Sequence, residues 1–231
     1  MNASIPRKRT GLRARAAFTL IELLVVIAVI ALLASMVVAV AGRSKESSHR
    51  AACVSGLRQL GMAVNLFAGE NNYELPGRVT GNSTDRWPRA LAPYVKDTRL
   101  YAAPGDPESW IQMGKDPLDN GRNNTSFIMN GYNDLLDSSA GGDLNAAVIQ
   151  VRTTQIERLS QVILFGMPRA DSDHFYMDIL EGPNGNQVDV LNTTVYSNGS
   201  CYLFADGSAR FLKAQDHNVQ LWLVNKEFAI P

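Results

Sequence analysis

The chain has 231 residues, of which 45% are hydrophobic and 19% are charged, and its formal net charge is zero. This composition excludes wholesale disorder and allows one membrane segment plus one modest folded domain. Residues 1–17 hold five basic and no acidic side chains, so the rest of the chain is mildly acidic. A mildly acidic body offers no electrostatic surface for nucleic acid, which excludes that class of partner.

A long apolar segment follows the basic stretch. Residues 23–41 read LLVVIAVIALLASMVVAVA, in which Ser35 is the only polar side chain. This is close to the roughly 20 residues that a helix needs to cross the hydrocarbon core of a bilayer. Because the positive charges precede the segment, we expect the N-terminus to stay cytoplasmic and the chain after residue 42 to be exported.

Glu22 distinguishes this segment from simpler apolar ones. Residues 39–41 offer the small-residue pattern of a cleaved secretory signal, but neither such a signal nor a plain anchor has a use for a carboxylate. The flanking charges argue against a buried core helix. An ionised carboxylate within lipid costs about 3 kcal/mol even on lenient scales. Residues 18–41 contain no Lys, Arg or His, so we expect the partner of Glu22 to come from outside the segment.

The residues around Glu22 resemble a known motif. Residues 15–28 read RAAFTLIELLVVIA, which resembles the cleavage and methylation motif of type IV prepilins and type II secretion pseudopilins. The resemblance implies that a membrane prepilin peptidase cuts between Ala17 and Phe18 and methylates the new N-terminus at Phe18. It also implies that Glu22 pairs with an N-terminal amine during subunit docking. Ala17 departs from the family, which usually has Gly at that position.

The segment after Gly42 predicts a continuation of the same helix. Apolar residues return in steps of four and three, which places them on one helical face; they are Cys53, Leu57, Leu60, Val64 and Phe67. We expect one helix over residues 18–70, ended by the polar cluster that follows it and by Pro76. The expected organisation is a leader at 1–17, a transmembrane helix at 18–41, an amphipathic continuation at 42–70 and an extracytoplasmic body at 71–231.

The body contains short strand patterns separated by loops. With the long helix packed on them, they predict an α+β fold with a small antiparallel sheet, a pilin-like arrangement. The clearest element is a hairpin over residues 201–212, in which Asp206-Gly207 predicts a two-residue turn with positive φ. A closing helix or strand is expected at 217–226 and a brief helix at 87–95. Other strands are expected at 125–129, 161–165 and 188–191.

Two further sets of side chains are candidates for bonds or ligands. Cys53 and Cys201 form no CxxC pair or metal-ligand spacing, and two interpretations stay open: one disulfide, or two small buried residues. The acidic stretch with Asp171, Asp173 and Asp178 is a weak calcium candidate, although it matches no EF-hand and a solvated loop is favoured. We expect no other cofactor.

The sequence contains no P-loop, GxSxG, HExxH or dinucleotide fingerprint, so we expect that the protein is not an enzyme. The resemblance implies a structural subunit, either a pseudopilin or a minor pilin, assembled through its N-terminal helix at the inner membrane. Its expected partners are the prepilin peptidase, other pilin or pseudopilin subunits and the inner-membrane assembly platform. The alternative function is a membrane-anchored extracytoplasmic binding protein or adhesin that does not polymerise.

Overall fold

A computed structural model describes residues 19–79, 85–106, 116–118, 125–135, 148–170, 172, 174–179 and 190–225. The side chains of residues 37–40, 133 and 148 are outside this description. The chain divides into two compact units, Met1–Ser44 and Lys45–Pro231, and each is described by itself.

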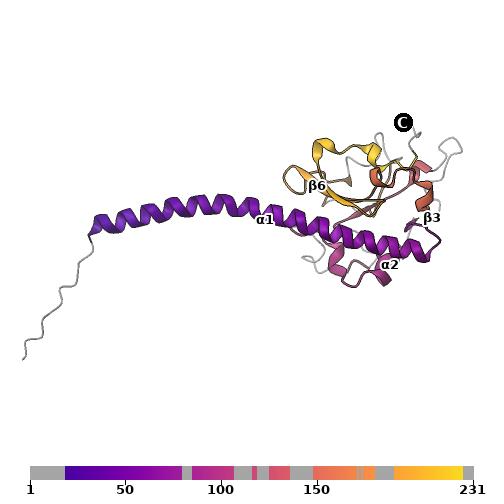
Figure 1. The fold of residues 1–231 in the computed structure, drawn as a ribbon, viewed down its shortest axis with the longest axis horizontal. Coiled ribbons are helices and arrows are strands. Elements are labelled where there is room, and N and C mark those ends of the chain that lie inside the picture. Colours follow the sequence, from indigo (N-terminus) through magenta and orange to yellow (C-terminus); the bar gives the residue numbers. More distant parts are fainter. Residues whose placement is uncertain are drawn as a thin grey trace, which may run out of the picture. The chain divides into compact units, whose positions relative to one another are not determined.

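A single helix, α1 (Leu20–Glu70), passes from the first unit into the second (Figure 1). The predicted long helix is therefore confirmed, since it begins and ends within two residues of the expected bounds. In the first unit, the large apolar side chains of residues 20–36 are between 46% and 80% exposed. Among the described residues, α1 is the one helix long and apolar enough to cross a membrane.

In the second unit, α1 buries four of the five residues of the predicted apolar stripe, and the fifth, Phe67, is partly buried. Cys53, Leu57, Leu60 and Val64 are at most 2% exposed, whereas Arg58 is exposed on the opposite face. The helix ends where Asn72 and Tyr73 adopt positive φ. The Tyr73 amide then donates to the Ala68 carbonyl at 2.8 Å, which satisfies one carbonyl at the helix end.

The sheet of the second unit has five strands in the order β5-β2-β4-β6-β7. The α+β fold class is confirmed, but the sheet is mixed, because β5 pairs with β2 in parallel and the other neighbours are antiparallel. A two-stranded antiparallel pair joins β1 (Arg78–Val79) to β3 (Val148–Ile149). The five strands are β2 (Ile128–Asn130), β4 (Ile163–Gly166), β5 (Tyr176–Met177), β6 (Gly199–Phe204) and β7 (Ala209–Lys213).

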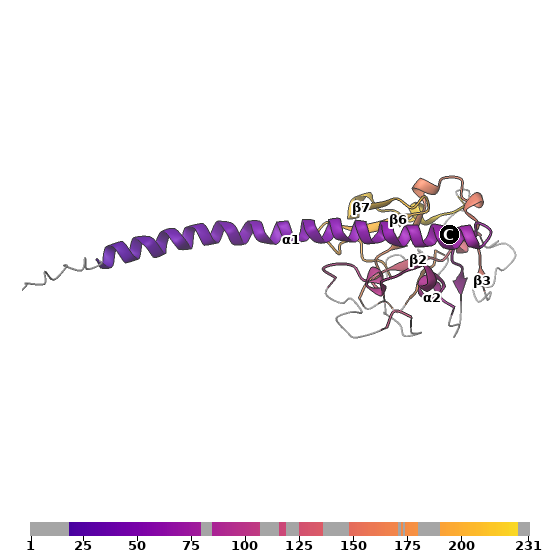
Figure 2. The same cartoon turned by 60° about the horizontal axis from the view of Figure 1, so that its bottom comes forward.

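Strand β6 separates two apolar clusters because its side chains alternate between the two faces. Cys201 and Leu203 join the cluster that contains the buried stripe of α1. Tyr202 and Phe204 join a second cluster around Trp222. The core is thus built on both faces of the sheet, with α1 covering one of them. Figure 2 shows the β6–β7 hairpin on one side of α1 and α2 (Trp87–Leu91) on the other in that view.

The hairpin is confirmed, but its turn differs from the expected one. The Phe204 amide donates to the Ser208 carbonyl, so three residues lie in the loop rather than two. Gly207 has a φ of 80°, and Asp206 is not among the residues with positive φ. The Asp206 carboxylate instead accepts the Ser208 amide at 2.8 Å. A short polar side chain that binds the backbone two residues ahead stabilises this longer turn.

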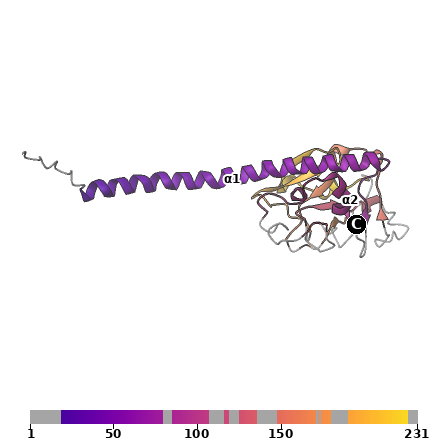
Figure 3. The same ribbon diagram turned by 90° about the horizontal axis from the view of Figure 1, so that it is seen from below.

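The remaining predicted elements agree with the structure to different degrees. The brief helix is confirmed as α2, continued by a 3₁₀ turn at Ala92–Tyr94 (Figure 3). Residues 217–226 were expected to close the fold as a helix or strand, and their described part holds a 3₁₀ turn at Val219–Trp222. Of the strand expected at 188–191, the described part makes only an isolated bridge from Leu191 to Pro168.

Candidate assembly site

The site begins at the first turn of α1, where Thr19 and Glu22 cap the helix reciprocally. The Thr19 amide and hydroxyl donate to Glu22 Oε2 at 2.9 and 2.8 Å. In return the Glu22 amide donates to Thr19 Oγ1 at 3.3 Å. This is a capping box, in which a threonine before the helix and a glutamate three residues later satisfy two amide donors that no helical carbonyl can reach.

The capping box gives Glu22 a hydrogen-bond partner from inside the apolar segment, in addition to the cationic partner that is expected from outside it. Thr19 is inside it, and the T-x-x-E spacing that predicts such a box is present in the sequence. Thr19 is neutral, however, so the charge of the carboxylate stays uncompensated by it. Within the described part of the chain, the second carboxylate oxygen, Oε1, has no hydrogen-bond partner.

The surroundings of Glu22 are apolar and open. Ile21 is 73% exposed and Leu23 is 58% exposed, and the apolar side chains of the next turns are similarly uncovered. A carboxylate with one free oxygen among such side chains is able to accept a cation that arrives with another apolar surface. The two predicted processing residues, Ala17 and Phe18, lie outside the described residues.

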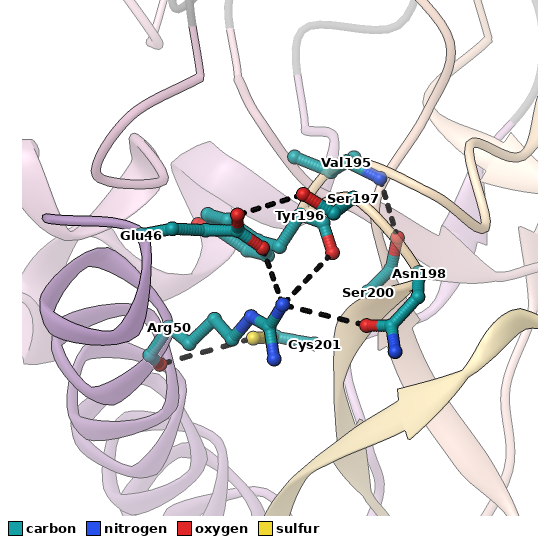
Figure 4. Close-up of polar contacts among 8 residues, drawn as sticks. All are labelled: Glu46, Arg50, Val195, Tyr196, Ser197, Asn198, Ser200 and Cys201. Carbon is teal, nitrogen blue, oxygen red and sulfur yellow. Dashed lines mark hydrogen bonds and ion pairs between the residues drawn. The ribbon is translucent and has the colours of Figure 1, made fainter. Parts of the chain in front are cut away.

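A second polar cluster, missed in the sequence, fastens the part of α1 that lies in the second unit to the loop before β6 (Figure 4). Glu46 accepts a hydrogen bond from Ser197 Oγ at 2.7 Å and forms an ion pair with Arg50 one turn later. The same guanidinium donates to Asn198 Oδ1 at 3.4 Å and lies 4.5 Å from the centroid of the Phe211 ring. The bond from Ser197, followed by that from Arg50, lowers the pKa of Glu46.

Cys53 and Cys201 are both fully buried, and both thiols are free. They come from α1 and β6 and belong to one apolar cluster, and Cys201 Sγ lies 3.9 Å from the carbonyl oxygen of Arg50, three residues before Cys53 on α1. The structure therefore brings together two residues that are far apart in the sequence. Whether they form a disulfide stays a prediction.

Asp178, the described member of the calcium candidate, is engaged by Arg78. Arg78 Nε donates to Oδ1 at 2.7 Å and Nη2 donates to Oδ2 at 2.9 Å, and both side chains are buried. Asp171 and Asp173 lie outside the described residues, so calcium binding stays a prediction. The described residues contain no group of three or more His, Cys, Asp or Glu side chains that would hold a metal ion.

Comparison with known proteins gives one match. Residues 12–38 match the family model of the prokaryotic N-terminal methylation motif, which is the prepilin-type signature. No curated protein and no solved structure matches the chain. Proteins that carry this motif as pilins are structural subunits rather than enzymes. The matched residues include Ala17, Phe18 and Glu22, so the capped turn of α1 lies inside a prepilin-type signature that leads directly into a candidate membrane anchor.

Proposed function

We propose that this chain is a filament subunit, either a pseudopilin of a type II secretion system or a minor pilin of a type IV pilus-like machine. A prepilin peptidase cuts between Ala17 and Phe18 and methylates Phe18. The helix over residues 18–41 holds the subunit in the inner membrane, with its N-terminus cytoplasmic and its body periplasmic or extracellular. An inner-membrane assembly platform then docks it onto other pilin or pseudopilin subunits.

The observation that carries this proposal is the free oxygen of Glu22 in an exposed apolar segment. Cleavage before Phe18 creates an amine, which is the cation that the segment otherwise lacks. Docking covers the apolar side chains and places the amine of one subunit against Glu22 of its neighbour. Because an unpaired charge is costly once it is covered, the pair favours one register of the helices over others.

A substitution series at Glu22 tests the charge separately from the helix cap. Glutamine is accepted at this position of a capping box, so Glu22→Gln removes the charge and keeps the cap, whereas Glu22→Ala removes both. We expect both variants to remain in the membrane. We expect both to lose filament incorporation to a similar extent, by about 100-fold if the lost pairing is worth about 3 kcal/mol.

The assay is incorporation into filaments in a host that carries a matching assembly machine, scored by shearing and immunoblotting. Thr19→Ser is the matched control, since it keeps a hydroxyl cap and leaves Glu22 unchanged. Normal assembly of Glu22→Gln contradicts the pairing. Mass spectrometry of the mature N-terminus gives an independent test, in which methylated Phe18 is expected. Filaments built from chains that retain residues 1–17 contradict the processing step, and an anchored chain that never polymerises favours the binding-protein alternative.

A further inference from the structure

The two buried thiols occupy a contact between the helix and the sheet. Cys201 Sγ lies 3.9 Å from the carbonyl oxygen of Arg50 on α1. Arg50 and Cys53 are three residues apart, so they occupy the same face of the helix one turn from each other. Side chains on a helix lean toward its N-terminus, which directs the Cys53 thiol back toward the turn that Cys201 contacts.

Both thiols lie in a closed apolar setting. Both cysteines are 0% exposed and belong to one apolar cluster. The hydroxyl of Tyr196, which donates to the Pro104 carbonyl at 2.8 Å, also contacts the Cys53 thiol. The bond from Cys201 lowers the pKa of the Cys53 thiol, and the same contact with burial raises that of Cys201.

We propose that Cys53 and Cys201 are a disulfide-forming pair that locks the exported part of α1 onto strand β6. The oxidant is a small-molecule or protein disulfide, and its presence around the body rests on the proposed export of residues 71–231. Formation in that compartment is favoured because disulfides persist in oxidising environments outside the cytoplasm.

The chemistry is thiol–disulfide exchange in two steps. The thiolate of one cysteine attacks one sulfur of the oxidant, which forms a mixed disulfide and releases one thiolate. The thiolate of the other cysteine then attacks the first cysteine's sulfur, which forms the intramolecular bond and releases the second thiolate. The two cysteines lose two protons and two electrons, and the oxidant is reduced to two thiols. Because both cysteines are buried once folding is complete, the exchange takes place before α1 has packed on β6.

The bond would stabilise the fold by restricting the unfolded chain. It links positions separated by most of the second unit, and long loops give the largest loss of unfolded-state entropy. We expect reduction to lower the melting temperature of the full chain by on the order of 10 °C. Cys53→Ala and Cys201→Ala each leave one thiol, so we expect their melting temperatures not to respond to reductant.

The test uses the full chain in detergent, unfolded with reductant and refolded with oxidised and reduced glutathione. Thiols are then counted after denaturation by the gel shift of a maleimide-linked polymer, and the linked peptides are identified by mass spectrometry. The expected result is a monomer that has no reactive thiol and yields a Cys53–Cys201 peptide. The proposed disulfide is contradicted if both thiols of the refolded monomer still react, or if the monomer carries only glutathione adducts.

A second arm separates this inference from the proposed function. The same thiol count is made on chains trapped with alkylating agent directly from cells that process and export them. An oxidised pair supports both proposals. If the purified protein oxidises readily but the cellular chain is fully reduced, the disulfide-forming pair stands and the export of the body is contradicted.

Discussion

Gly61 of α1 and Leu203 of β6 lie so close together that a Cβ atom on Gly61 would come within 2.9 Å of Leu203 Cδ1 and 3.1 Å of the Gly207 carbonyl oxygen. Glycine in a helix interior is normally a cost. Here it removes the side chain that would hold the helix away from the hairpin. Gly61 is therefore a contact position between α1 and the β6–β7 turn, rather than the bend that a helical glycine suggests.

Gly61→Leu is expected to destabilise the body by about 2 kcal/mol, because a larger side chain in a filled contact forces the helix or the hairpin to shift. Urea denaturation monitored by tryptophan fluorescence measures this. Gly56→Ala is the matched control, since a Cβ atom there meets nothing within 4 Å. We expect the control to gain about 0.5–1 kcal/mol from helix propensity. Equal effects of the two substitutions contradict the close contact.

Thr19→Ala is expected to weaken the first turn of α1 without removing the charge of Glu22. Losing a hydroxyl cap costs about 1 kcal/mol, so the amides of residues 20–23 should exchange with solvent about fivefold faster. Hydrogen exchange of the chain in detergent measures this. If the proposed pairing depends on the charge alone, Thr19→Ala still assembles. A loss of assembly as large as that of Glu22→Gln contradicts a dependence on the charge alone, because it shows that the cap is required as well.

Asp178→Asn is expected to destabilise the body by about 3–5 kcal/mol, because it removes the negative charge that accepts two hydrogen bonds from the buried Arg78 guanidinium. Thermal denaturation of the full chain measures the loss. Arg99→Gln is the comparison variant, since the Arg99–Asp97 pair is 79% and 46% exposed. Exposed pairs contribute little, so this change should lie within the error of the measurement. A small effect of Asp178→Asn contradicts a structural role for the buried pair.

His217 is expected to make the body less stable in acid. Burial lowers the pKa of His217, and Trp222 Nε1 donates to His217 Nε2 at 3.0 Å, which only the neutral ring can accept. The unfolded state therefore binds more protons below the ordinary histidine pKa of about 6.5, so stability falls as the pH drops through that value. Urea midpoints across this range measure the effect, and His217→Gln should flatten it. A variant with the same pH profile as the wild type contradicts this role.

Asp134 is expected to have the opposite effect from His217, since it makes the body more stable in acid. Burial raises its pKa to about 6, although the Asn225 amide donates to Oδ2 at 2.6 Å. Between about pH 4 and pH 6 the folded state binds more protons than the unfolded state, so stability falls as the pH rises. Asp134→Asn removes this ionisation and should stabilise the body at pH 7 by on the order of 2 kcal/mol. Equal stabilisation at pH 4 contradicts an effect of charge.

Local patterns in the sequence predicted a large part of the fold. The bounds of α1, its buried stripe and the β6–β7 hairpin follow from apolar spacing and turn residues, because these signals act over a few residues. The methylation motif around Glu22 is equally local, and so is the capping box with Thr19, which the T-x-x-E spacing predicts. The turn at Asp206-Gly207 shows the limit of such signals, since the residues predict a turn but not its length.

Contacts between distant segments of the body depend on tertiary packing and cannot be predicted from the spacing of residues in the sequence. The parallel pairing of β5 with β2, the buried bond from Arg78 to Asp178 and the contact of Cys53 with Cys201 join segments that no periodic pattern relates. Such contacts depend on how α1 and the strands bury one shared apolar core, since that arrangement alone brings distant segments within bonding distance. The chain's own residues thus indicate a membrane-anchored prepilin-type helix, and folding decides which side chains hold that helix to the sheet.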